Sequence, residues 1–237
     1  MTSPVPDIPN PESSNETKGK KKTFWIVLCV FIFLVIIGIL LFITVTESGD
    51  KSALNPAAYS YFNQTWEGQT IYLPPTVAST LKWTDANGKG WIVVYANGSN
   101  VVIKNRKTTH DPTMAELKAF LKRDRTNSFI YVNGSFDCNS FAIMLHDNAE
   151  ANSIRCGFVC VRFNGSCAGH ALNAFQTTDD GLVFVDDTGT PKGNGKDSFV
   201  KINIGYPVSE VPVFKSDSLS LVYLWCKEPV STGVIFW

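Results

Sequence analysis

A run of 22 residues without a charged side chain, Phe24–Val45, constrains this chain more than any other feature of its sequence. As an α-helix rising 1.5 Å per residue, the run would be about 33 Å long, enough to cross a bilayer core about 30 Å thick. A signal peptide has a shorter apolar core of about 7–15 residues, followed by a small-residue cleavage site that the sequence here does not resemble. A helix that is apolar on every face is also unusual in the core of a small domain. The run therefore predicts one transmembrane helix over residues 24–45.

The lysines that flank this run predict its orientation. Lys18, Lys20, Lys21 and Lys22 precede it, whereas Lys51 is the only cation in the twenty residues that follow it. Because cations concentrate on the cytoplasmic side of membrane helices, the N-terminus is expected in the cytoplasm. We therefore expect a single-pass protein of the cell membrane whose C-terminal domain lies outside.

The remaining sequence divides by composition. Residues 1–23 are rich in Pro, Ser, Asn and Lys and predict a flexible cytoplasmic tail, and residues 46–60 predict a short stalk. Residues 61–237 have the composition of one folded domain. Because the chain has 21 Lys and Arg against 21 Asp and Glu, it lacks the basic surplus of a nucleic-acid-binding protein, and no nucleic-acid partner is expected.

Five of the six cysteines follow the apolar run, so at least one of them is unpaired within the chain or pairs between chains. Cys160 and Cys167 flank the turn sequence Asn164-Gly165, which predicts a cross-strand disulfide between them. Cys156 and Cys160 would lie about 13 Å apart on an extended strand, too far to bond to each other.

Hydrophobic periodicity predicts an α+β domain in which helices pack on an antiparallel sheet. A hairpin is expected where residues 91–95 and 101–104 flank Asn97-Gly98. Two helices should follow, one after a cap at Asp111 or Thr113 and the other from Cys138 to Ala151. Three strands are then expected as a meander, at GFVCVRF, GHALNAFQ and GLVFVDD, with further strands at residues 199–204 and 219–226.

Three residues of this region form a candidate catalytic set. Cys138 opens the second helix, where the helix dipole favours a thiolate, although a buried structural cysteine is the ordinary alternative. His170 lies on the second strand of the meander, where a core histidine is the ordinary alternative. If the second and third strands pair around residues 177–180, Asp186 becomes a cross-strand neighbour of His170 and orients its imidazole. Asp187 would then lie on the opposite strand face and matter much less.

These motifs resemble the transglutaminase-like superfamily, whose core is a papain-like fold. The family pattern is a helix-opening Cys, a strand with H-A-W-V-E-V and a strand that ends in D-P-T. Here these are Asp137-Cys138, then His170 to Phe175, then Val185 to Gly189, and the resemblance covers residues 112–190. Leu172, Asn173 and Ala174 depart from the pattern where the lining of the substrate cleft is expected, and Asp187 replaces the Pro.

The resemblance implies a cysteine enzyme that performs acyl transfer or amide hydrolysis on a protein or peptide through a thioester. Cys138 would be the nucleophile, His170 the base and Asp186 its orienting group, and Asn133 and Tyr131 are candidate oxyanion donors. No cofactor or metal is implied. The competing hypotheses are a non-catalytic binding or adhesion module on the same fold, and an anchored subunit of a larger envelope complex. Outside the membrane, the sequons at Asn63, Asn97, Asn133 and Asn164 predict possible glycosylation sites.

Overall fold

A computed structural model describes residues 64–214 and 226–237. The predicted tail, transmembrane helix and stalk lie outside these residues, as does most of the strand expected at 219–226. Neither α-helix in the described ranges combines the length and apolar character that a bilayer crossing needs.

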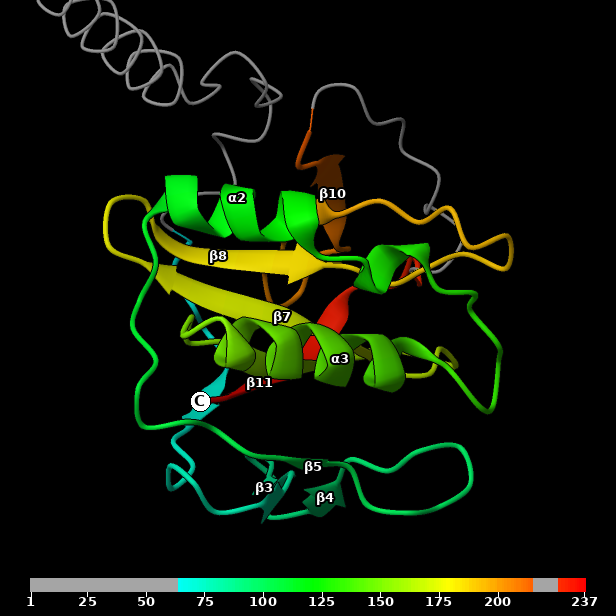
Figure 1. Ribbon diagram of the computed structural model, residues 1–237. Helices are drawn as coiled ribbons and strands as arrows, with labels where there is room; N and C mark the ends of the chain where they lie inside the picture. Colours follow the sequence, from blue (N-terminus) through cyan, green and yellow to red (C-terminus); the bar gives the residue numbers. More distant parts are fainter. Residues whose placement is uncertain (1–63, 215–225) are drawn as a thin grey trace, which may run out of the picture. The chain divides into compact units, whose positions relative to one another are not determined.

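A seven-stranded sheet forms the centre of the described domain, in the order β1-β11-β6-β7-β8-β9-β10 (Figure 1). All neighbouring strands run antiparallel except β1 and β11, which are parallel. Its strands are β1 (Gln69–Ile71), β6 (Gly157–Phe163), β7 (His170–Thr177), β8 (Gly181–Asp186), β9 (Ser198–Lys201), β10 (Ser209–Pro212) and β11 (Val230–Phe236).

The meander β6-β7-β8 is where its sequence predicted it. Short turn sequences separate the three strands, and Gly181 adopts a positive φ of 75°, which a residue without a Cβ reaches at little cost. The strands are rich in Val and Phe because both of their faces are covered. The expected strand at residues 199–204 is shorter, as β9.

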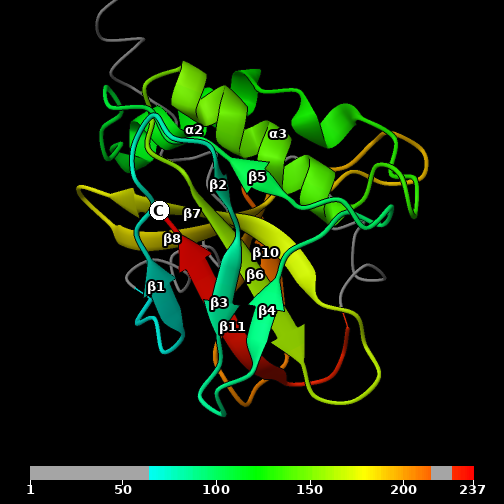
Figure 2. The ribbon, with the colours of Figure 1, turned by 90° about the horizontal axis from the view of Figure 1, so that it is seen from below.

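The two predicted helices cover one face of the sheet (Figures 1 and 2). Helix α2 (Met114–Arg123) begins at Thr113, whose hydroxyl accepts a hydrogen bond from the Glu116 N–H while the Glu116 carboxylate accepts one from the Thr113 N–H. Of the two caps expected from the sequence, Thr113 is therefore the one used. Helix α3 (Cys138–Ala151) has the predicted bounds, and a short 3₁₀ helix, η3 (Thr126–Ser128), lies between the two.

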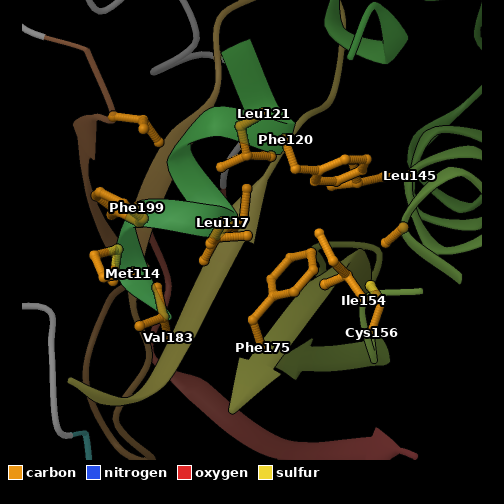
Figure 3. Close-up of a cluster of buried hydrophobic side chains, with 13 residues drawn as sticks. Met114, Leu117, Phe120, Leu121, Leu145, Ile154, Cys156, Phe175, Val183 and Phe199 are labelled. Carbon is orange, nitrogen blue, oxygen red and sulfur yellow. The ribbon is translucent and has the colours of Figure 1, made fainter. Parts of the chain in front are cut away.

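The core on this face joins both helices to the sheet (Figure 3). Phe120 and Leu121 of α2 and Leu145 of α3 pack with Phe175 of β7 and Val183 of β8, all at most 2% exposed. Side chains that alternate with these along the strands, such as Leu172, Ala174 and Phe184, belong to a second cluster. Burial on both faces stabilises β7 and β8, the strands that carry His170 and Asp186.

The segment before α2 forms two small sheets rather than the single expected hairpin. Strand β2 (Ser79–Thr80) pairs with β5 (Val102–Ile103), and β3 (Lys82–Thr84) pairs with β4 (Gly90–Ile92). The turn at Asn97-Gly98 is present, closed by the Gly98 N–H donating to Tyr95 O, but the residues on its two sides form the isolated bridge Val94–Asn100 rather than a pair of strands. The expected strand partners were therefore partly wrong, because Trp83 stacks on Trp91 and holds β4 against β3.

The C-terminal strand corrects the expected topology. Strand β11 inserts between β1 and β6, so the sheet continues beyond the meander and includes both ends of the domain. Val234 pairs with Cys160 of β6 on one side and with Gln69 of β1 on the other. No local pattern indicates such a pairing between segments so distant in sequence.

The predicted Cys160–Cys167 disulfide is wrong. Cys167 bonds to Cys226 with a Cα–Cα distance of 5.9 Å, and Cys160 is free. Cys160 lies within β6 opposite Ala171, whereas Cys167 lies beyond the strand, in the loop that leads to β7. The disulfide ties this loop to the segment before β11.

Candidate active site

Cys138 is the first residue of α3, as predicted, and is half-buried. Asp137 caps the helix by accepting a hydrogen bond from the Asn139 N–H at 3.1 Å. The Asn139 side chain donates to Val94 O at 3.2 Å, which ties the helix start to the segment before the Asn97-Gly98 turn. Cys138 is thus held at the positive end of a 14-residue helix, which favours negative charge on its sulfur.

His170 and Asp186 form a buried ion pair. His170 Nε2 lies 3.1 Å from Asp186 Oδ2, and the two residues are 6% and 1% exposed. Strand β7 pairs with β8 so that Thr177 faces Gly181, two positions away from the predicted register. His170 and Asp186 are therefore diagonal rather than directly opposite neighbours. Because side chains alternate with a period of two, a shift of two positions preserves the contact.

The Asp186 carboxylate is held from its other side as well. Its Oδ1 accepts a hydrogen bond from the Thr188 N–H at 2.9 Å, so each carboxylate oxygen has one partner. Burial alone would raise the pKa of Asp186, but the His170 charge and the bonds to His170 and Thr188 outweigh it and lower the pKa below its usual value. Asp186 is therefore ionised at neutral pH and fixed in orientation.

The thiol of Cys138 is a second partner of the His170 ring. Burial alone would lower the pKa of His170, but the Asp186 charge and hydrogen bonds to Asp186 and Cys138 raise it to about 10. Because Nε2 faces Asp186, Nδ1 is the ring nitrogen left to face the thiol. The structure thus brings together Cys138, His170 and Asp186 in the order thiol, imidazole, carboxylate. This is the order that acid–base activation of a nucleophile requires.

The two candidate oxyanion donors occupy different environments. The Tyr131 ring stacks on Phe141 with centroids 6.3 Å apart, and its main-chain N–H is already bonded to Thr190 O. Burial, followed by the nearby charges of Cys138 and Asp137, raises the pKa of the Tyr131 phenol, so its neutral O–H remains available as a donor. Asn133 is exposed in the turn between Val132 and Phe136. The structure therefore favours the Tyr131 hydroxyl over Asn133.

The family departures on β7 do not line a cleft, contrary to expectation. Leu172, Asn173 and Ala174 are at most 1% exposed. The Asn173 Nδ2 donates to Ala142 O of α3 at 2.9 Å and lies 3.3 Å from Cys156 Sγ. Asn173 thus fixes α3 on the sheet, whereas Leu172 and Ala174 pack in the second cluster on the opposite face. The sequence did not predict this hydrogen bond from Asn173 to α3, which is called the Asn173 clamp below. It also did not predict the hydrogen bond from the Thr188 N–H to Asp186, although Thr188 belongs to the quoted V-D-x-T motif.

The other histidines lie apart from this set. His146 is buried and bonds to Asp147 and Asn105, and His110 is exposed near Glu116. Within the described ranges, one cluster of potential metal ligands occurs, Cys167 with Cys226 and Glu228, but its two sulfurs are joined in the disulfide.

Three predicted glycosylation sites are exposed in turns: Asn97, Asn133 and Asn164. Asn63 lies outside the described residues. Exposure makes these three side chains accessible acceptors, and Asn133 is only five positions before Cys138.

No protein-family model matches the chain, and no curated protein matches it at a significant level of similarity.

Proposed function

We propose that the chain is a membrane-anchored, outward-facing cysteine enzyme of the transglutaminase-like, papain-like kind. The observation that carries this proposal is the convergence of Cys138, His170 and Asp186 from α3, β7 and β8. A buried, charge-stabilised imidazole in contact with a thiol at a helix start is costly to build and suits acyl transfer.

The chemistry follows from the placement of the three groups. The Cys138 thiolate attacks the carbonyl carbon of an amide, and the resulting oxyanion accepts a hydrogen bond from a donor such as Tyr131. The His170 imidazolium gives its proton to the leaving amine as the C–N bond breaks, which leaves a thioester on Cys138. His170 then takes a proton from water or from an acceptor amine, which attacks the thioester and frees the thiol.

In this proposal, Asp186 stabilises the imidazolium without taking its proton. The chemistry requires no metal or organic cofactor. The substrate is proposed to be a protein or peptide, because the predicted transmembrane helix presents the domain to extracytoplasmic macromolecules. Water as the acceptor gives amide hydrolysis, and an amine gives transamidation.

The test uses the full chain in detergent micelles. Unfolded casein serves as the substrate, with release of peptides and incorporation of a fluorescent primary amine as the two readouts. We expect Cys138→Ala to abolish whichever activity is present and Cys160→Ala, which removes a second free thiol, to retain it. Activity should be blocked by iodoacetamide and unaffected by a fluorophosphonate. An activity that survives in Cys138→Ala, or no activity together with an unreactive Cys138, would favour the binding module instead.

A further inference from the structure

Two buried carboxyl groups that the proposed reaction does not use lie at the ends of the β8–β9 connection. Asp187 follows β8 directly and Asp197 precedes β9, and they are 2% and 3% exposed. The register of β8 and β9, in which Val185 faces Phe199 and Asp186 faces Ser198, places Asp187 opposite Asp197 in the next pair, so the two carboxyl groups are neighbours. Two carboxylates cannot donate to each other, so a hydrogen bond between these buried neighbours requires a proton on one of them.

The surroundings indicate which residue carries the proton. Asp197 Oδ1 accepts a hydrogen bond from Asn127 Nδ2 at 2.8 Å, as expected of a carboxylate. Neither oxygen of Asp187 receives an N–H or hydroxyl donor from the described part of the chain. A protonated Asp187 needs no such donor, because it is itself the donor to Asp197.

The same surroundings disfavour a bound cation. Among the described residues, no third carboxylate, imidazole or thiol has its ligand atom within 4.8 Å of both groups. The charged neighbours that act most on Asp187 are Asp197, Asp124 and Asp186, which are all acidic, while the nearby His170 is bonded to Asp186. Burial first, and then these carboxylates, raise the pKa of Asp187 well above its usual value.

The connection between the two carboxyl groups packs against the segment that leads to Cys138. The Tyr131 N–H donates to Thr190 O at 2.9 Å. A Cβ on Gly189 would collide with Phe129 O, and one on Gly195 would lie 2.6 Å from Asn127 O, so both glycines permit close backbone contact. Residues 188–196 therefore form the platform on which residues 127–131 rest.

We propose that Asp187 is a neutral carboxylic acid that donates its proton to the Asp197 carboxylate, and that this shared proton closes the platform beneath residues 127–131. Asp187 is thus a positioning residue, acting through Tyr131 and the neighbouring Asp186. Proton sharing stands without the proposed function, and only its effect on Cys138 chemistry rests on that function. Loss of the proton would place two negative charges side by side in the interior. Their repulsion would move residues 188–196 away from residues 127–131.

The decisive variant is Asp187→Asn, because an amide donates the same hydrogen bond and never ionises. Glu67→Gln removes one exposed carboxylate and is the matched control. All proteins are the full chain in detergent. Infrared spectra in D₂O at neutral pH should show a protonated carboxyl band in the wild type and in Glu67→Gln, and that band should be missing in Asp187→Asn.

Urea unfolding as a function of pH is the second measurement. Above the unfolded pKa of about 3.9, the folded chain holds a proton that the unfolded chain has released. The stabilisation by this proton is complete below the unfolded pKa. As the pH rises from there to the folded pKa, the equilibrium constant for folding falls by up to about tenfold per pH unit. Asp187→Asn should lack this part of the alkaline decline, whereas Glu67→Gln should keep it.

The third measurement is the rate at which iodoacetamide labels Cys138. Asp187→Asn should match the wild type at neutral pH and retain its rate at a higher pH, whereas Asp187→Ala should be slower at both. Absence of the infrared band, an unchanged pH dependence of unfolding in Asp187→Asn, or failure of Asp187→Asn to fold would each overturn the proposal. If the band and the pH effect are found but the protein is inactive, proton sharing stands and the proposed enzyme function fails.

Discussion

At the scale of single residues, the His170–Asp186 pair determines what Cys138 can do. A buried charge is tolerated only when it is paired and hydrogen-bonded, and here the imidazole and the carboxylate satisfy each other while Thr188 satisfies the second carboxylate oxygen. The thiol therefore faces a ring that is protonated at neutral pH and cannot rotate freely.

Replacing Asp186 should reduce the rate of the proposed reaction by at least about tenfold, because the imidazole loses its orientation and its counter-charge. The substitution Asp186→Ala tests the rate, and Asp186→Asn, which keeps the shape and a bond to the ring, helps to preserve the fold. Circular dichroism should show a folded domain in the Asn variant. A rate equal to that of the wild type in both variants would remove Asp186 from the site.

Strand alternation predicts that Asp187 matters much less than Asp186 for the rate of the reaction, and this stays a prediction. Asp187 lies beyond β8, is buried and neighbours Asp197, so its replacement is expected to act through stability and through the position of residues 188–196. Replacing Asp186 is thus expected to disturb the orientation of the imidazole, whereas replacing Asp187 is expected to change the pH dependence of folding.

Cys138 should be alkylated by iodoacetamide faster than Cys156 or Cys160. The His170 ring and the start of α3 lie beside the Cys138 sulfur, whereas burial raises the pKa of Cys156 well above its usual value and that of Cys160 to about 12. Mass spectrometry of labelled peptides over a pH series measures each thiol separately. Replacing His170 with Ala should slow Cys138 alone. Labelling of Cys138 only above about pH 8.5, as for an ordinary thiol, would contradict the enzyme hypothesis.

The His170–Asp186 pair should also affect the pH dependence of unfolding. The pKa of His170 is raised to about 10, so its stabilisation is complete below the unfolded value of about 6.5 and is lost as the pH rises through 10. The pKa of Asp186 is lowered, so its stabilisation is present above about 3.9 and is lost in acid. Urea titrations of His170→Asn beside the wild type should show a smaller alkaline decline in the variant. Equal slopes between pH 6.5 and 10 would contradict the ion pair.

At the scale of elements, the start of α3 is fixed from three directions. Asp137 caps it, Asn139 ties it to the turn region near Val94, and Asn173 holds its second turn on β7. A helix held in this way keeps the thiol in place relative to β7 and β8, which a loop would not do as well.

The Cys167–Cys226 disulfide should stabilise the fold without entering the reaction. It closes a loop of 59 residues, for which chain entropy predicts about 4 kcal/mol. We expect the double variant Cys167→Ala/Cys226→Ala to unfold at lower urea while Cys138 keeps its labelling rate under folding conditions. An unchanged unfolding midpoint would show that the disulfide constrains little. A slower Cys138 in the folded variant would show that the disulfide also positions the site.

At the scale of the whole molecule, the lysine asymmetry around residues 24–45 predicts that the domain faces outward. Protease added to intact cells should therefore digest residues beyond about 50 and spare an epitope tag placed on the N-terminal tail. Permeabilised cells, in which both sides are exposed, provide the control. An accessible tag together with a protected domain would reverse the orientation.

The sequence by itself determined the helices and strands that depend on residues close together along the chain. Apolar spacing and capping placed α2 and α3, turn residues bounded β6 to β8, and a period of two kept His170 and Asp186 in contact despite a register shifted by two positions. The three members of the candidate site were identifiable for the same reason, since each lies in a short motif at the end of a predicted element.

Only the tertiary structure decided the pairings between distant segments. The insertion of β11 between β1 and β6, the bond of Cys167 to Cys226, and the clamp from Asn173 to α3 join residues from 31 to more than 100 positions apart. The sequence placed Asp187 only on the strand face opposite Asp186, and the fold decided that Asp187 is buried beside Asp197. Local patterns report which face of an element is apolar, but which other element covers that face depends on packing of the whole chain.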